Sequence, residues 1–198
     1  MKSIYILLFF IGISTLKVEK IFYEKLSDAA ISLTKDKVEY DGKYFSIKYP
    51  NGDVPKNKGV CTDVLIRAYR KLGIDLQKEV HEDMKNNFSK YPKIWGLKKP
   101  DTNIDHRRVP NLQVFFTRFG QSLGVSEKAS DFKTGDLVTW KNNGKLPHIG
   151  IVTNKKTADG KRNLIVHNVG AGQVLEDCLF KYDMTGHYRF QSVNSKIR

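Results

Sequence analysis

The spacing of apolar residues changes along this 198-residue chain, and that change limits the possible folds more than any other feature. Apolar residues in the first part recur three and four positions apart, which is typical of amphipathic helices. The last third instead contains short β-type runs separated by Gly, Asn and Lys turns, over residues 137–140, 149–153, 164–167 and 187–190. Helices followed by strands indicate the α+β class. We therefore predict N-terminal helices packed on a small antiparallel β-sheet.

Local signals place the earlier elements. Asp41-Gly42-Lys43 is a turn signal between two alternating runs, so we predict a small hairpin over residues 38–48, followed by a loop over residues 49–59. Helices are predicted over residues 20–34, from Thr62 to Gly73, from Asp75, and after Pro110.

The N-terminus carries Lys2 and then an apolar run from Ile4 to Ile13. This pattern is typical of a signal peptide, and the run is short for a membrane span, which needs about 20 residues. No Ala-x-Ala site follows it, so an N-terminal anchor is the alternative. We expect residues 1–18 to be a signal peptide or N-terminal anchor, residues 19–198 to form a single domain, and the protein to be periplasmic or secreted.

Charge and composition narrow the class of partner. The net charge of +13 favours contact with polyanions, while 40% hydrophobic residues exclude a disordered or collagen-like chain. Export disfavours nucleic acid, and the lysines are scattered rather than interleaved with stacking aromatics. We expect a solvated basic surface, no nucleic-acid partner, membrane contact only through the N-terminal segment, and a monomer.

Three residues can supply thiol chemistry. Cys61 opens a helix, where a thiol pKa is lowered, and His148 and His167 lie on two apolar runs that adjacent strands can bring together. A thiolate nucleophile, a base and an orienting group are what a cysteine peptidase or amidase needs. Three alternatives are open: a Cys61–Cys178 disulfide, a zinc site formed by these three residues, and ordinary buried side chains.

The order of these motifs resembles the NlpC-type cysteine peptidases of the papain-like superfamily. The matching parts are the helix-start Cys61, the turn Gly135-Asp136, the strand His148-Ile149-Gly150-Ile151 and the segment Ile165-Val166-His167. The resemblance implies an NlpC-like fold with Cys61 as nucleophile, His148 as base and His167 as orienting residue. It implies no cofactor and no metal. Val60 and Thr62-Asp63 depart from the Asp-Cys-Ser usual in those enzymes, so substrate preference does not carry over.

A closer resemblance links nearly all of the chain after residue 25 to the exported bacterial family called domain of unknown function 1287. The matching segments include Gly59-Val60-Cys61-Thr62-Asp63-Val64, Val80-His81-Glu82-Asp83-Met84, the stretch 103–111 and Gly186-His187-Tyr188-Arg189. Together the resemblances imply an exported cysteine hydrolase that cleaves an amide bond, but they imply no particular substrate. Peptidoglycan peptides are the expected substrate, because an anionic cell-wall polymer suits the basic surface. A non-catalytic cell-wall-binding module and a thiol acyltransferase are the alternatives.

The segment from Tyr91 to Val109 exceeds a minimal NlpC core. Asp105-His106-Arg107-Arg108 occurs in it together with Trp95. We expect Trp95, His106, Arg107 and Arg108 to line the cleft and an arginine fork to bind a substrate carboxylate. The alternative is a capping loop with solvated arginines. We further expect Asp136 to cap backbone amides and His187 to be structural, and the role of Asp63 is left open.

Overall fold

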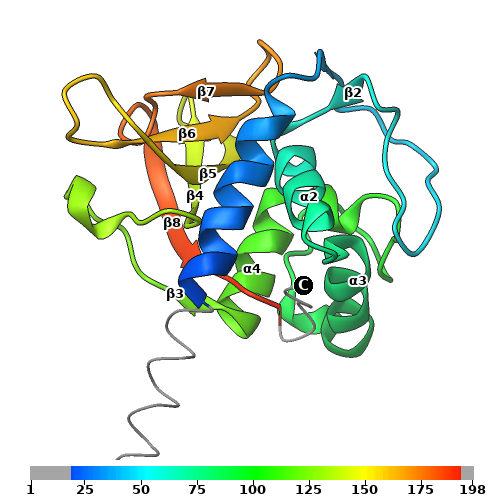
Figure 1. The fold of residues 1–198 in the computed structure, drawn as a ribbon. Coiled ribbons are helices and arrows are strands. Elements are labelled where there is room, and N and C mark those ends of the chain that lie inside the picture. The colour runs from blue at the N-terminus through cyan, green and yellow to red at the C-terminus, as the bar shows by residue number, and fades with distance from the viewer. Residues whose placement is uncertain (1–18, 193–198) are drawn as a thin grey trace, which may run out of the picture.

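The computed structural model describes residues 19–192, in which helices cover one face of a β-sheet (Figure 1). Residues 19–33 form the N-terminal helix, and the other helices are α2 (Cys61–Lys71), α3 (Leu76–Asn87) and α4 (Val109–Phe119). The predicted leader, residues 1–18, lies outside the described residues. No helix within 19–192 is both long and apolar enough to cross a bilayer.

The main sheet is antiparallel and has the strand order β3-β8-β4-β5-β6-β7. Its strands are β3 (Gln121–Ser122), β4 (Leu137–Asn142), β5 (Leu146–Lys156), β6 (Asn163–His167), β7 (Val174–Glu176) and β8 (Asp183–Arg189). The α+β class and the antiparallel sheet predicted from the sequence are therefore confirmed. Two short strands, β3 and β7, were not predicted.

The predicted helices α2, α3 and α4 are confirmed, and their boundaries follow from local chemistry. Asp75 caps α3 by accepting a hydrogen bond from the backbone N–H of Lys78 at 3.3 Å. Pro110 lies in the first turn of α4, where a missing N–H costs nothing, and Gly120 follows its last residue. Gly73 follows α2 with φ +80°, a left-handed conformation that glycine adopts without strain.

Alternation along the strands divides the apolar residues between two cores. Ile149 and Ile151 face the helices in the larger core, whereas Val152 belongs to a smaller cluster on the other face. Cys61 lies in the larger core and Cys178 in the smaller one. The two cysteines are free, so the alternative of a disulfide between them is not found.

The hairpin predicted over residues 38–48 is wrong. β1 (Glu39–Tyr40) instead pairs in parallel with β2 (Lys58–Gly59), which immediately precedes α2. The side chain of Asp41 makes the expected turn by accepting the N–H of Lys43 at 3.0 Å. After that turn the chain bonds elsewhere, since the N–H of Ile47 donates to the side chain of Asn103 at 2.9 Å. The side chain of Asn103 therefore takes the place that a neighbouring strand would have had as hydrogen-bond partner.

Gly150 lets strands β5 and β6 approach closely beside the two histidines. A Cβ atom at this position would lie 2.6 Å from Cγ2 of Ile165 and 3.2 Å from Cβ of His167. Neither neighbour has room to move away, because both lie in the buried sheet. Glycine is therefore required here by packing rather than by backbone conformation.

Gly150→Ala is expected to destabilise the protein by roughly 1–3 kcal/mol, because it overpacks the contact between β5 and β6. Urea unfolding followed by circular dichroism measures this change. Gly42→Ala is the matched control, since its new Cβ would meet only Cγ1 of Val60 at 3.9 Å. Equal stability of the two variants would contradict the packing role of Gly150.

Candidate functional site

Cys61 is the first residue of α2, and Asp63 fixes the backbone around it. The Asp63 carboxylate accepts a hydrogen bond from the N–H of Val60 at 2.7 Å, which is the backbone half of a capping box. Cys61 therefore lies between two residues, Val60 and Asp63, that this hydrogen bond joins. Asp63 was the residue whose role the sequence left open.

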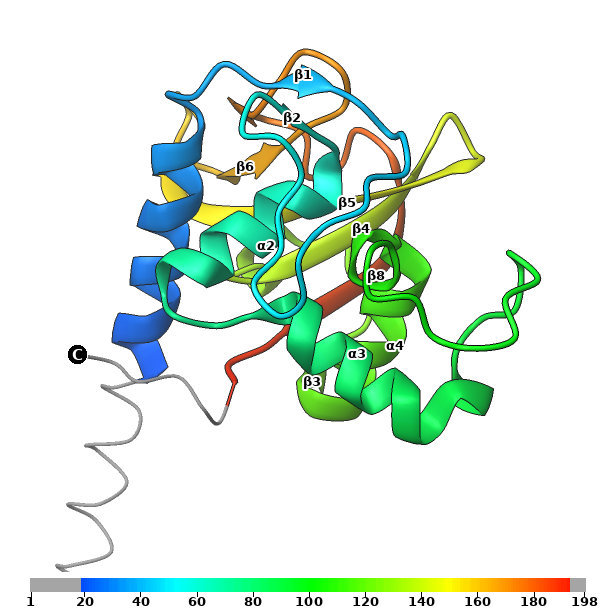
Figure 2. The ribbon, with the colours of Figure 1, turned by 90° about the vertical axis from the view of Figure 1, so that its right-hand side faces the viewer.

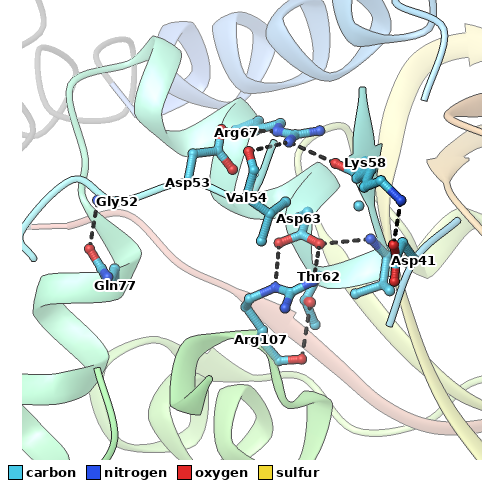
Figure 3. Close-up of polar contacts among 12 residues, drawn as sticks. Asp41, Gly52, Asp53, Val54, Lys58, Thr62, Asp63, Arg67, Gln77 and Arg107 are labelled. Atoms are coloured by element: carbon cyan, nitrogen blue, oxygen red, sulfur yellow. Dashed lines mark hydrogen bonds and ion pairs between the residues drawn. The ribbon is translucent and has the colours of Figure 1, made fainter. Parts of the chain in front are cut away.

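A buried ion pair ties this helix start to the segment that precedes α4. Nε and Nη2 of Arg107 donate to the two oxygens of Asp63, each at 2.9 Å, and both side chains are almost fully buried (Figure 3). The hydroxyl of Thr62 donates to the carbonyl of Arg107 at 3.1 Å. The segment Asp105–Arg107, one turn of 3₁₀ helix, is therefore clamped against the first turn of α2.

The resting thiol of Cys61 differs from the expected thiolate. Burial raises its pKa to about 12, and the nearby carboxylate of Asp63 adds to the rise. Backbone N–H groups of Ile149, Thr62 and Cys61 itself favour the thiolate and oppose this rise. Desolvation outweighs the helix-start effect, so Cys61 is a protonated thiol at neutral pH in this conformation.

The two candidate imidazoles form a hydrogen-bonded pair, as their positions on adjacent strands predicted. Nε2 of His148 on β5 lies 2.9 Å from Nδ1 of His167 on β6. Both rings are buried, and burial lowers the pKa of His148 to about 3 and also lowers that of His167. Both rings are therefore neutral at pH 7, and one proton occupies the hydrogen bond between the two nitrogens.

A carboxylate on β7 extends the pair into a series. Nε2 of His167 lies 3.0 Å from Oε2 of Glu176, whose other oxygen accepts a hydrogen bond from Nζ of Lys181 at 2.5 Å. Lys181 lowers the pKa of Glu176 and keeps it ionised. An ionised carboxylate only accepts, so His167 carries its proton on Nε2 and accepts at Nδ1. His148 then carries its proton on Nε2, and its Nδ1 is left as a free base.

The position of Cys61 relative to this series completes the geometry. The thiol faces the backbone N–H of Ile149, the residue next to His148. Within residues 19–192, no hydrogen bond joins the sulfur to either imidazole, and the ring contacts of His148 are with Trp140, His167 and Tyr182. The Cys61 thiol lies in the larger core, whereas the His148 ring packs on Trp140 and Tyr182 of the smaller cluster on the other face of the sheet. The two groups are therefore not paired in the resting structure.

The structure does not favour the zinc alternative. Among the described residues, no group of three or more His, Cys, Asp or Glu side chains has an arrangement that holds a metal ion. The nitrogens of His148 and His167 that face each other are already committed to their mutual hydrogen bond.

The four residues expected to bind substrate are separated by the structure into two groups. Arg107 is occupied by Asp63, and His106 is buried with its pKa lowered to about 3 by burial, so neither is available to a substrate carboxylate. Arg108 and Trp95 are more accessible, and the guanidinium of Arg108 lies 4.1 Å from the centre of the Trp95 ring. The expected arginine fork is not formed, because Arg107 binds Asp63 and the half-buried Arg108 pairs with Asp105 at 3.6 Å.

Asp136 makes the backbone cap that was expected of it, and it also binds the buried His187. Asp136 caps the turn by accepting the N–H of Lys133 at 2.8 Å, and it also accepts from Nε2 of His187 at 2.7 Å and Nη1 of Arg189 at 2.5 Å. His187 stacks on Phe132 with ring centres 4.4 Å apart. This network borders a cavity of about 890 Å³ that is also lined by Tyr23, Lys20 and Glu24.

Sequence reasoning missed Glu176 and the clamp formed by Asp63 and Arg107. Glu176 lies nine residues after His167, on a strand of three residues that periodicity did not reveal. No local signal pairs Asp63 with Arg107, because 44 positions separate them.

Comparison with known proteins gives a family and a relative. The family described as Domain of unknown function (DUF1287) matches residues 27–190. The chain is 48% identical over 165 residues to the protein named "Uncharacterized protein YijF" of Escherichia coli (strain K12). That alignment covers 83% of this chain and 80% of the relative.

Arg107→Ala is expected to destabilise the protein by roughly 3–5 kcal/mol, because it leaves the Asp63 carboxylate buried without its partner. Chemical unfolding measures the loss. Arg162→Ala is the matched control: Arg162 also binds a carboxylate through two nitrogens, that of Asp177, but at the surface. We expect little change in that control. If both variants lost the same stability, the buried pair would not be the anchor of the helix start.

Proposed function

Because the chain belongs to the family described as domain of unknown function 1287, and because its histidines and a carboxylate form an ordered series beside the Cys61 helix, we propose that it is a thiol hydrolase with an NlpC-like, papain-like fold. The observation that carries the proposal is the series His148–His167–Glu176, with distances of 2.9 and 3.0 Å. Such a series orients an imidazole and stabilises the imidazolium formed during acyl transfer.

The proposed reaction begins with transfer of the thiol proton of Cys61 to Nδ1 of His148. Its Nε2–H keeps donating to His167, and the charge of the imidazolium is balanced by Glu176. The thiolate attacks the carbonyl carbon of an amide, and the backbone N–H of Cys61 donates to the developing oxyanion. His148 then returns its proton to the leaving amine, which departs and leaves a thioester.

Water completes the reaction. His148 takes a proton from water as the resulting hydroxide attacks the thioester carbonyl, and the carboxylic acid product leaves as the thiol of Cys61 is restored. Substrate binding must bring Cys61 and His148 within reach in this mechanism, because the thiol and the His148 ring lie in different clusters of the resting structure. Burial also raises the pKa of Cys61 to about 12, which favours the protonated thiol until substrate binds. Substrate binding therefore activates the site in this mechanism.

The proposed substrate is a peptide amide of the bacterial cell wall, peptidoglycan. Two features support this choice: the N-terminal pattern of an export signal, and a net charge of +13 that attracts an anionic polymer. In this proposal the protein works as a monomer in the periplasm or outside the cell. It uses no cofactor and no nucleic-acid partner.

A non-catalytic cell-wall-binding module is the second candidate, and the buried, protonated thiol favours it. In that case the fold binds peptidoglycan without cleaving it. A thiol acyltransferase would share the first half of the reaction, with an added amine or alcohol replacing water. Product analysis with and without an added amine separates transfer from hydrolysis.

The test is the release of soluble peptides from purified peptidoglycan, measured by chromatography and mass spectrometry. Cys61→Ser and His148→Ala are expected to abolish release while binding to the polymer persists. Glu176→Gln is expected to lower the rate by about 10²–10⁴-fold, because it removes the charge that balances the imidazolium.

Asp177→Asn is the matched control for Glu176→Gln. Asp177 is adjacent in sequence but pairs with Arg162 at the surface, so its variant is expected to retain full activity. Peptide release that persists in Cys61→Ser would refute the thiol mechanism. Binding by the wild type without any release would favour the binding module.

A further inference from the structure

The segment between α3 and α4 exposes an apolar tip. Figure 2 shows this part of the chain extending away from the helices and the sheet. Ile94 is 71% exposed, the largest exposure of any large hydrophobic residue within 19–192, and Trp95 beside it is 37% exposed. Two adjacent apolar residues at such a position contribute nothing to the core, so their placement suggests an external contact.

Positive charge surrounds this tip. Lys90, Lys93, Lys98 and Lys99 are all exposed, and residues 90–100 contain no acidic residue. The guanidinium of Arg108 packs 4.1 Å from the centre of the Trp95 ring and pairs with the carboxylate of Asp105 at 3.6 Å, so the lysines supply the unpaired charge of the tip. The combination of an exposed tryptophan, an aliphatic residue and clustered lysines is typical of segments that bind at the surface of an anionic bilayer.

The base of the segment is held in place. The hydroxyl of Tyr44 donates to Asp101 at 3.0 Å and accepts from Nδ2 of Asn103 at 2.7 Å. The side-chain oxygen of Asn103 in turn accepts the N–H of Ile47 at 2.9 Å. These hydrogen bonds fix residues 101–103, where the segment rejoins the body of the protein. The tip therefore loses little conformational entropy when it binds a partner.

We propose that residues 90–99 form a docking tip for the surface of an anionic lipid bilayer. Ile94 and Trp95 enter the boundary between headgroups and acyl chains, while the four lysines contact lipid phosphates. A soluble anionic polymer satisfies the lysines but gives Ile94 no apolar environment, so the exposed isoleucine favours the bilayer. The contact is additional to any made by the N-terminal segment and does not depend on the proposed hydrolase activity.

Tryptophan fluorescence of the full chain tests this proposal directly. The chain has two tryptophans, and Trp140 is fully buried, so Trp95 reports on the tip. Residues 1–18 contain no tryptophan, and their insertion into lipid therefore adds no signal of its own. Vesicles of phosphatidylcholine with about one third phosphatidylglycerol are expected to shift the emission to the blue, whereas pure phosphatidylcholine vesicles and high salt are expected to give no shift.

Variants assign the response to the tip. Trp95→Phe is expected to remove the blue shift, and Ile94→Ser to raise the lipid concentration for half-maximal shift by about tenfold through loss of apolar contact. Val125→Ser is the matched control, because Val125 is 59% exposed on a different loop, and its titration is expected to equal that of the wild type. The proposal is overturned if the vesicles bind the chain without a Trp95 shift, if neutral vesicles give an equal shift, or if Ile94→Ser titrates like Val125→Ser.

Discussion

The buried ion pair between Asp63 and Arg107 is the contact on which the arrangement of this molecule depends. It joins the first turn of α2, which carries Cys61, to the segment that leads into α4. The guanidinium of Arg107 satisfies both oxygens of this buried carboxylate, which still adds to the rise in the pKa of Cys61. The same pair removes Arg107 from the surface, so the arginine that was expected to bind substrate instead supports the helix start that carries Cys61.

The candidate site combines an ordered base with a resting nucleophile. Glu176 determines which nitrogen of His167 carries a proton, and His167 in turn determines the tautomer of His148. Each of these assignments follows from one hydrogen bond, given an ionised Glu176 and two neutral rings, which the lowered pKa values of all three groups favour. Cys61 is buried and protonated, so in the proposed mechanism the site is activated when substrate binds. Burial and protonation protect this thiol from oxidation.

The sequence was sufficient for features that depend on local pattern. Periodicity predicted the helices and the antiparallel sheet, and Asp75, Pro110 and Gly120 marked helix ends because capping is a property of neighbouring residues. The expected positions of His148 and His167 on adjacent strands also predicted that their rings would meet. The predictions that were wrong concern residues whose partners are distant in the sequence. β1 pairs with β2 rather than with the run that follows it, and Arg107 is neutralised by Asp63. Contacts of this kind are determined by packing in the folded core, and a short stretch of sequence does not contain that information.

The central claim is that the carboxylate of Glu176 orders both imidazoles so that Nδ1 of His148 is the free base. Nuclear magnetic resonance of the full chain with ¹⁵N-labelled histidine, at pH 7, measures the protonation of each ring nitrogen. The account predicts that His148 and His167 are both neutral and both protonated at Nε2, and that Glu176→Gln disturbs this pattern. A His148 ring protonated at Nδ1, or an imidazolium at either position, would contradict it.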